Sequence, residues 1–359
     1  MEVGSTETPS VDGPPTHSSP WSNQGVVPWS DDFVFDNPTQ RIIIAIAACL
    51  ITVIGIPGNI MVILAVMLSK KLQNKTNVFV VNLACADMLT CAVLPFQAVS
   101  LLNETPPLPS FLCRMVAIFV WLGVGSSVVN LALIAFIRYS LITKSRSYSD
   151  RLLTKPKLSL FICGAWFVPF LIIVLPLPFD VGYLGYSPTY KMCTGYWKDP
   201  LSEISTVIDL FIAFLCLIVI MLCYVKIYRF VRNAGRNLIQ PRNSITINED
   251  PESSRTAPLT STEVAIFRRQ VEVTKNLFIV VCTYVICVMP YGFSNIPGPK
   301  NPFVPWTILL LYMNSCLNPI IYGLKHPQFK EVFWAIITCS WRNIPEPSLV
   351  VSFFCNIST

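Results

Sequence analysis

Long apolar segments alternate with shorter polar ones along most of the sequence. A helix needs about 20 apolar residues to cross the hydrocarbon core of a bilayer. Several segments meet this requirement, and we expect helices at 42–68, 77–102, 112–139, 158–178, 204–228, 273–294 and 304–324. The pattern therefore predicts an all-α membrane protein, a seven-transmembrane helix bundle with its two ends on opposite sides of the membrane.

The composition supports a membrane protein. Hydrophobic residues make up 53% of the 359 residues and charged residues 13%, whereas a soluble domain carries about 25% charged residues. The surface of a water-soluble protein of this size needs more charged residues than the chain has, so the bilayer is the expected solvent.

The Lys and Arg residues set the expected orientation, because cytoplasmic loops carry an excess of positive charge. With the N-terminus outside, nearly all of the 26 Lys and Arg lie on the cytoplasmic side. The exceptions are Arg41, Arg114, Lys191, Lys198 and Lys300. This asymmetry explains the net charge of +6 without nucleic acid as a partner. We expect a multi-pass plasma-membrane protein with an extracellular N-terminus and a cytoplasmic C-terminus.

The chain divides into four expected parts. Residues 1–40 are rich in Ser, Thr, Pro, Asp and Glu and are expected to form a disordered extracellular tail without a cleavable signal peptide. Residues 41–324 form the bundle, residues 325–339 a short amphipathic eighth helix on the membrane surface, and residues 340–359 a cytoplasmic tail. Cys339 ends the surface helix and is either a palmitoylation site or a free thiol.

Two other classes of membrane protein fit the sequence less well. A transporter or channel would show inverted repeats and charges at mid-membrane, but no internal repeat is visible and Asp87 is the only ionisable residue deep in the bundle. An intramembrane enzyme would need paired aspartates, a Ser/His couple or a cluster of histidines. The only histidines, His17 and His326, lie outside the expected spans. We therefore expect a receptor and no catalytic residues.

Polar residues inside a membrane are costly and usually functional, and here they recur at particular places in the spans. In chain order they are Gly58-Asn59, Asn82-Leu83-Ala84-Cys85-Ala86-Asp87, Ile137-Arg138-Tyr139, Trp166, Asn314-Ser315-Cys316-Leu317-Asn318-Pro319-Ile320-Ile321-Tyr322 and, after the last span, Phe329. With these motifs the chain resembles class A, rhodopsin-like G-protein-coupled receptors over residues 41–339. Residues 133–139 look most like the melatonin-receptor-like group, which includes medium-chain-fatty-acid and invertebrate orphan relatives.

The resemblance implies a polar hub around Asp87. The family gathers oxygen-bearing side chains, a sodium ion and water around this aspartate, and the matching positions here are Ser127, Asn314, Ser315 and Asn318. A second interpretation is a neutral Asp87 in a hydrogen-bond network with Asn59. Apart from the sodium ion, no cofactor is expected.

The resemblance also assigns residues to G-protein coupling. Arg138, followed by Tyr139, matches the arginine that meets the G protein. The other positions matched to activation are Tyr224, Pro290, Asn318, Pro319 and Tyr322. Tyr224 and Tyr322 match a pair that stabilises the open cytoplasmic cavity through a water, and Pro290 should kink its helix.

Several switch positions depart from the family pattern. Ile137 and Gln270 stand where acidic residues usually hold the arginine. We therefore expect a weakly latched resting state with raised basal signalling, unless Glu272 or packing replaces the latch. Val288 replaces the usual toggle tryptophan and Cys216 replaces the proline of the fifth span, which argues against the standard toggle mechanism.

The outer face carries two expected covalent features. The family joins the positions of Cys113 and Cys193 by a disulfide that pins the second outer loop over the pocket. Asn103-Glu104-Thr105 is the sole sequon expected on the outer face, so Asn103 is the expected glycosylation site.

The family binds its ligands in the outer half of the bundle. Val120 stands where amine receptors carry an aspartate, and Tyr312 stands where an opsin attaches retinal. A monoamine site and a photoreceptor are therefore not expected. The expected lining is apolar and aromatic, namely Phe96, Val120, Trp121, Val124, Tyr291, Trp306 and Tyr312. Arg114 and Asp209 either bind a ligand of opposite charge or lie at the membrane interface.

The expected partners follow from the resemblance. They are an extracellular small-molecule, lipid or peptide ligand, membrane lipids and a heterotrimeric G protein, with the inhibitory class suggested by the melatonin-receptor-like group. The inner loop at 232–270 is polar and expected to be flexible. Its candidate sites for receptor kinases, and hence for arrestin binding, are Ser244, Thr246, Ser253, Ser254, Thr256, Thr260, Ser261 and Thr262.

Overall fold

The computed structural model describes residues 34–175, 183–196, 203–239, 261–294, 301–348 and 351, with only the backbone described at 183, 196, 203–206, 209, 234–239 and 261–277. Residues 1–33 of the expected tail at 1–40, most of the long inner loop and the end of the chain lie outside the described residues. The long helices are α1 (Pro38–Leu68), α2 (Asn77–Leu102), α3 (Ser110–Thr143), α5 (Lys155–Val174), α6 (Glu203–Ile239), α7 (Ser261–Ser294) and α8 (Val304–Lys325).

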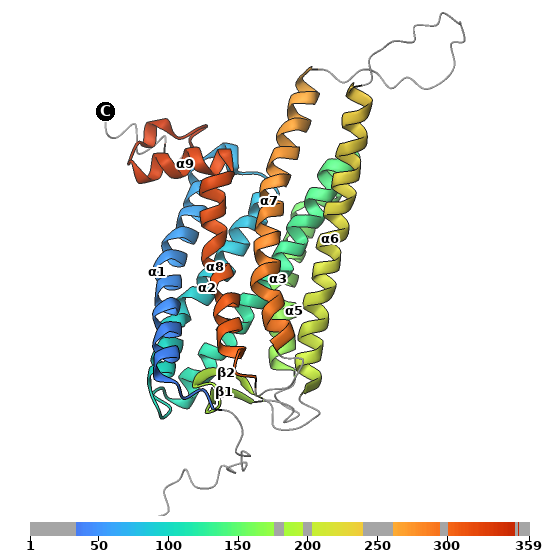
Figure 1. Cartoon of the computed structure of the whole chain (residues 1–359). Coiled ribbons are helices and arrows are strands. Elements are labelled where there is room, and N and C mark those ends of the chain that lie inside the picture. Colours follow the sequence, from blue (N-terminus) through green and yellow to red (C-terminus); the bar gives the residue numbers. More distant parts are fainter. Residues whose placement is uncertain are drawn as a thin grey trace, which may run out of the picture. The chain divides into compact units, whose positions relative to one another are not determined.

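Shorter elements connect the long helices or follow them. They are η1 (Lys70–Leu72), α4 (Arg146–Leu152), β1 (Tyr183–Ser187), β2 (Met192–Tyr196), α9 (Pro327–Ile337) and η4 (Trp341–Asn343). The strands form an antiparallel hairpin, and α9 is the expected amphipathic helix. We call the end of the bundle with the hairpin the outer end and the end with α9 the inner end (Figure 1).

The helices agree with the spans expected from apolar length. Within the described ranges, all the long helices except α7 are long and apolar enough to cross a membrane. In α7 the described apolar part is Phe278–Ser294, which lies within the expected span. Several helices run beyond the expected spans, since α1 begins at Pro38 and α3 ends at Thr143. Helical hydrogen bonds continue into the polar flanks, which an apolar pattern does not detect.

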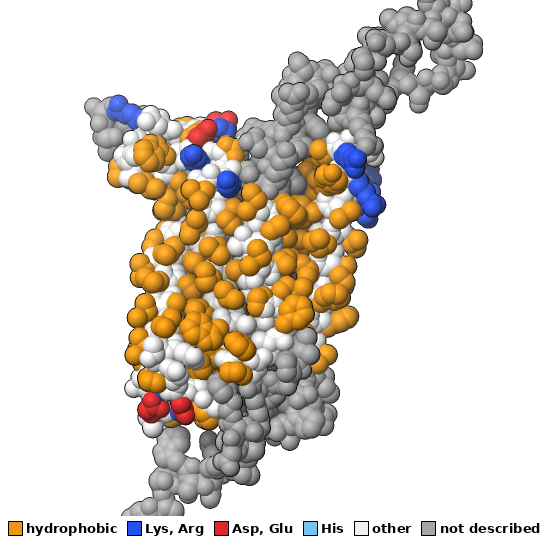
Figure 2. Space-filling view, in the orientation of Figure 1, with side chains coloured by type: hydrophobic (Ala, Val, Ile, Leu, Met, Phe, Trp, Pro, Cys, Tyr) orange, Lys and Arg blue, Asp and Glu red, His pale blue; other side chains and the backbone are white. Residues whose placement is uncertain are grey.

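The helices form one bundle with α3 at its centre. α3 contacts α2, α5, α6 and α7, while α1 packs against α2 and α8 (Figure 1). Figure 2 shows hydrophobic side chains over the middle of one face, with Lys and Arg near α9 and at the inner part of α6. Val53, Leu160 and Ile286 are each about seven-tenths exposed. An apolar surface this extensive requires lipid rather than water as its surroundings.

Glycine allows two helices of the bundle to approach closely. A Cβ atom added to Gly123 of α3 would collide with Thr90 Oγ1 and lie 2.9 Å from the Ala86 carbonyl oxygen of α2. Because the second obstacle is backbone, it cannot be removed by a change of side-chain rotamer. Small residues at such crossings let helix backbones pack directly in membranes.

The hairpin closes part of the outer end, and the segment before α1 packs onto it. Tyr186 pairs with Cys193 across the hairpin. The Phe35 backbone N–H donates to the Thr189 carbonyl at 2.8 Å, and the Phe35 side chain is buried. Lys191 of the hairpin lies 3.6 Å from the Asp36 carboxylate. The residues just before the first span are therefore part of the outer cover.

A buried arginine joins α1 to the outer end of α2. Arg41 is 3% exposed. Its Nε donates to the Leu101 carbonyl at 2.6 Å, NH2 donates to the Asn103 carbonyl at 2.9 Å, and NH1 bonds the Glu104 carboxylate at 2.6 Å. The hydrogen bond from Arg41, with a smaller contribution from Lys191, lowers the pKa of Glu104.

The chain after α9 folds back onto the first inner loop. The Ser348 backbone N–H donates to the Leu68 carbonyl at 2.8 Å, and the Lys70 N–H donates to the Glu346 carbonyl at 2.8 Å. The Ser69 hydroxyl donates to the Pro345 carbonyl at 2.6 Å. The described part of the expected cytoplasmic tail is thus ordered against the inner end of α1.

The close approach at Gly123 predicts a stability effect. Gly123→Ala should lower the melting temperature of the purified protein by several degrees, because overpacking costs about 1–3 kcal/mol. Gly164→Ala in α5 is the control, since an added Cβ there meets nothing within 4 Å. It should leave the melting temperature unchanged or raise it slightly. Equal melting temperatures for the two variants would contradict the close packing of α2 against α3.

The ion pair of Glu104 predicts a dependence on pH. Because its pKa is lowered in the folded protein, ionised Glu104 stabilises the outer loop in full at pH values above the ordinary Glu pKa of about 4.3. This stabilisation is lost as the pH falls below that value. After correction for intrinsic rates, hydrogen exchange of the backbone amides of residues 103–105 should accelerate on acidification. Glu104→Gln should abolish this acceleration, while Asp150→Asn at the inner end should retain it. An acceleration that persists in Glu104→Gln would rule out this carboxylate as its cause.

Candidate functional site

Asp87 of α2 lies fully buried between α3 and α8. Its carboxylate accepts a hydrogen bond from the Ser127 hydroxyl at 2.8 Å and another from the Asn318 side-chain amide at 2.7 Å. Ser315 lies within electrostatic reach of the same carboxylate. The polar hub expected from the sequence is therefore assembled from three helices.

The hub has the oxygen atoms that a hard cation needs. The side-chain carbonyl oxygens of Asn314 and Asn318 are buried and accept no hydrogen bond, and they accompany the Asp87 carboxylate and the Ser127 hydroxyl. Hard cations prefer such oxygen ligands, so the residues fit the sodium ion implied by the resemblance. Asn59 instead donates to the carbonyls of Gly55 and Ser315, each at 2.9 Å, and so ties α1 to α8 beside the hub.

A second polar chain crosses the bundle nearer the inner end. The Asn82 side-chain N–H donates to the Asn130 side-chain oxygen at 2.8 Å, and the Trp166 indole N–H donates to the Asn82 side-chain oxygen at 2.9 Å. These bonds connect α2, α3 and α5. Trp166, taken from the sequence as a family marker, is thus part of a contact among three helices.

Arg138 lies at the inner end with two tyrosines from other helices. It is 4% exposed and within electrostatic reach of Tyr224 of α6 and Tyr322 of α8. The hydroxyl groups of both tyrosines are buried without a hydrogen-bond partner. Tyr322 also stacks on Phe329 of α9, with ring centroids 5.4 Å apart. The structure therefore brings together three of the residues matched to activation.

The neighbours of Arg138 in sequence have different surroundings. Ile137 is fully buried in the inner core and offers no carboxylate. The Tyr139 ring lies under two cations, with Lys144 Nζ at 5.7 Å and Lys226 Nζ at 5.4 Å from its centroid. The side chains of Gln270 and Glu272 lie outside the described residues, so the proposed substitute latch remains a prediction.

Two prolines of the activation set lie inside continuous helices. Pro290 lies inside α7 and Pro319 inside α8. Val288 and Cys216 both pack against the inner core in place of the usual tryptophan and proline. Tyr284, one turn before Val288, is buried and its hydroxyl has no hydrogen-bond partner.

Aromatic residues gather in the outer half of the bundle. The rings of Trp121 and Tyr291 lie 5.5 Å apart and tilted, and the Trp121 indole N–H donates to the Thr194 hydroxyl of the hairpin at 3.4 Å. Tyr291 belongs to one outer hydrophobic cluster with Trp306 and Tyr312 of α8. Val120 is packed in this cluster with 1% of its surface exposed.

The remaining sequence candidates are more dispersed. Val124 is half-buried, while Phe96, Arg114, Asn103 and Cys339 are exposed. The Asn103 side-chain N–H donates to the Val99 carbonyl at 2.7 Å, and the free Cys339 lies two residues after the last residue of α9. The side chain of Asp209 lies outside the described residues.

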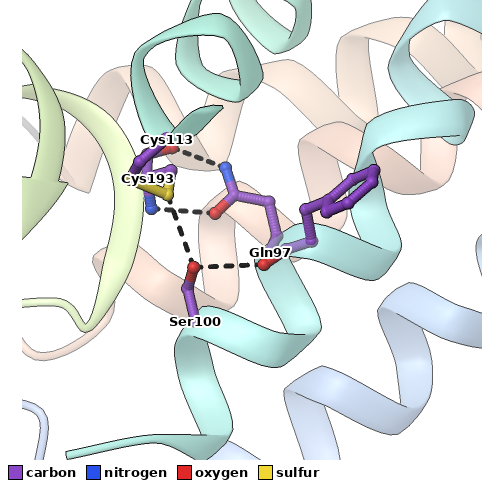
Figure 3. The surroundings of a disulfide bond; sticks show 5 residues. Gln97, Ser100, Cys113 and Cys193 are labelled. Carbon is purple, nitrogen blue, oxygen red and sulfur yellow. Dashed lines mark hydrogen bonds between the residues drawn. A yellow bond between two sulfur atoms is a disulfide. The ribbon is translucent and has the colours of Figure 1, made fainter. Parts of the chain in front are cut away.

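The disulfide expected between Cys113 and Cys193 is present. Gln97 of α2, which the sequence motifs do not include, lies beside it (Figure 3). The Gln97 side-chain N–H donates to the Cys193 carbonyl at 2.5 Å, and its oxygen accepts from the Cys193 backbone N–H at 2.9 Å. A polar residue in an otherwise apolar span could have indicated this contact.

Comparisons with known proteins agree with this architecture. The chain is 30% identical to the mouse melatonin receptor type 1A over 297 residues, which cover 79% of this chain and 77% of that receptor. It is 32% identical to the zebrafish melatonin receptor type 1B-B, with 81% and 80% covered. The Drosophila G-protein coupled receptor moody is 24% identical, with 82% of this chain matched to 51% of that longer receptor.

A solved structure and a family model give the same result. Squid rhodopsin shares the fold, with a TM-score of 0.70 and 19% identity over 87% of this chain and 93% of that one. Residues 58–322 match the model of the 7 transmembrane receptor (rhodopsin family). The chain therefore belongs to the rhodopsin family of seven-transmembrane, G-protein-coupled receptors, which are multi-pass membrane proteins and not enzymes.

Proposed function

We propose that this receptor binds an extracellular ligand in the aromatic outer half of the bundle and activates a heterotrimeric G protein of the inhibitory class. The observation that carries the proposal is Arg138 at the inner end, buried beside Tyr224 and Tyr322. Three helices thus meet at the residue that the family uses to contact the G protein.

The outer half favours a ligand with apolar or aromatic groups. Trp121 and Tyr291 present ring faces and edges, and Thr194 supplies a neutral polar atom nearby. Val120 provides no carboxylate where an amine receptor would have one. A small molecule, a lipid or a peptide with an aromatic group fits this chemistry better than a monoamine.

The proposed mechanism is a shift between two arrangements of the bundle. A ligand that binds more tightly to the arrangement with the inner end of α7 moved outward increases its population. In that arrangement Arg138 becomes available to the G protein. Water can then link the hydroxyls of Tyr224 and Tyr322, which have no partner in the described arrangement.

We further propose that the resting state is weakly latched. The support is the buried, apolar Ile137 beside Arg138, together with Gln270 at the second position where the family usually carries an acid. A latch that lacks these carboxylates raises the fraction of active receptor before ligand binds.

Other proposed sites lie on the surface. Asn103 is exposed at the outer end, as a glycosylation site requires, and Cys339 is exposed after α9. Trp334 and Ile337 of α9 are also exposed, so a palmitoyl chain on Cys339 would enter the same lipid surface. Receptor kinases and arrestin are proposed as partners of the Ser/Thr-rich inner loop, where phosphate adds negative charge.

Ligand-free G-protein activation in cells tests the receptor function and the latch. At matched surface expression, wild type should activate inhibitory G protein, and Arg138→Ala should abolish this basal signal. Ile137→Asp should lower it about fivefold, the effect of roughly 1 kcal/mol, because an adjacent carboxylate restrains Arg138.

Ile137→Asn is the matched control, with the shape of the aspartate but no charge. It should leave basal activity closer to wild type than Ile137→Asp does. A wild type that is silent toward inhibitory, stimulatory and phospholipase-linked G proteins would refute the weak latch. Equal effects of the Asp and Asn variants would assign the change to polarity in the core instead of charge.

A sodium ion at the Asp87 hub predicts salt-specific stabilisation. Sodium bound to the folded protein raises its melting temperature by mass action, so wild type should melt higher in sodium chloride than in choline chloride at equal ionic strength. Asp87→Asn should abolish the difference, whereas Asn59→Ala should retain it. Identical melting of wild type in the two salts would favour the neutral hub.

A further inference from the structure

Gln97 is an amide enclosed by the outer core. Its side chain belongs to α2, is 0% exposed and lies beside the disulfide between Cys113 and Cys193 (Figure 3). A primary amide in such surroundings is costly unless both its donor and its acceptor are used. Its partners therefore show what the residue holds in place.

Two of these bonds go to the backbone of one residue. The amide of Gln97 accepts from the Cys193 N–H and donates to the Cys193 carbonyl, as a neighbouring strand would. The Ser100 hydroxyl, one turn further along α2, lies 3.4 Å from the Cys193 sulfur. The disulfide ties the hairpin to α3, and Gln97 ties the same residue to α2.

A third interaction leads to another helix. Tyr312 of α8 is buried and lies within electrostatic reach of the Gln97 side chain. Through this one amide, α2, α8 and the hairpin meet at the top of the outer cluster, with α3 joined by the disulfide. Tyr312 also stands two residues before Asn314, whose carbonyl oxygen belongs to the Asp87 hub.

We propose that Gln97 is a positioning residue of the ligand site, which couples the outer hairpin to α8 through Cys193 and Tyr312. The proposal rests on the proposed function in one respect, that the ligand binds in the outer half. A ligand that displaces the hairpin then also displaces α8, and a ligand that displaces Tyr312 destabilises the hairpin.

The physical basis is that the buried amide of Gln97 loses polar partners when the hairpin or Tyr312 moves away from it. Movement of the hairpin removes two hydrogen bonds, and rotation of Tyr312 removes the interaction with its hydroxyl. The same helix α8 carries Asn314, Ser315 and Asn318 of the hub. A shift of α8 at Tyr312 therefore reaches the centre of the bundle, and the coupling is measured as follows.

The test is hydrogen exchange of the hairpin, residues 184–195, in the purified full-length receptor without ligand or G protein. Gln97→Met keeps the approximate volume and removes the amide, and it should speed exchange of the hairpin about fivefold to tenfold through loss of the hydrogen bonds. Ser100→Ala is the control on the same helix, and it should change the exchange less than twofold.

Tyr312→Phe distinguishes coupling between α8 and the hairpin from a general destabilisation of the outer end. It should speed hairpin exchange in the wild-type background and have no further effect in Gln97→Met, because the interaction between Tyr312 and the Gln97 amide is already absent. If Gln97→Met fails to fold, Gln97→Glu replaces it, since it keeps the acceptor for the Cys193 N–H but loses the donor.

The outcomes separate this proposal from the proposed function. The proposal is overturned if the hairpin exchanges at the same rate in the Gln97 variant and in Ser100→Ala. It is also overturned if Tyr312→Phe has the same effect in the wild-type and Gln97→Met backgrounds. Because no signalling is measured, a receptor that activates no G protein can still support it. Conversely, a signalling receptor can fail this exchange test, so each proposal stands or falls by its own measurement.

Discussion

Burial of polar groups in apolar surroundings is the constraint on which the rest of this structure depends. An ionised carboxylate placed in a medium of low dielectric constant has to be neutralised or partnered. Asp87 meets this requirement by drawing Ser127 from α3 and Asn318 from α8 to its two oxygens. The same bonds fix three helices relative to one another, so that the site and the fold have a common cause.

The other polar contacts of the bundle follow the same rule. Between helices in a bilayer, apolar side chains gain little over contact with lipid, and association depends on close packing and interhelical hydrogen bonds. Asn59 joins α1 to α8, and Asn82 joins α2 to α3 and α5. Gly123 lets α2 and α3 approach. Directional bonds and close crossings thus select one arrangement from the many that apolar surfaces would allow.

The two ends of the receptor carry different chemistry on this frame. At the outer end, Arg41 and Gln97 hold loops and helices through backbone carbonyls, over a cluster of aromatic rings. At the inner end, Arg138 is buried with Tyr224 and Tyr322, and the residue before it is the apolar Ile137. α8 contributes to both ends and to the Asp87 hub between them, since it carries Tyr312, Asn318 and Tyr322.

The sequence by itself determined the membrane class, the spans, the orientation and, through motifs, the family and the residues of the hub. These follow from local apolar length, from charge and from short patterns that need no knowledge of distant partners. Only the tertiary structure decided that Gln97 hydrogen-bonds to Cys193, that Arg41 hydrogen-bonds to Leu101, and that the chain after α9 hydrogen-bonds to Ser69. Each of these contacts joins residues at least 60 positions apart. A buried donor accepts any suitably placed carbonyl, and only the packed bundle determines which one lies within reach.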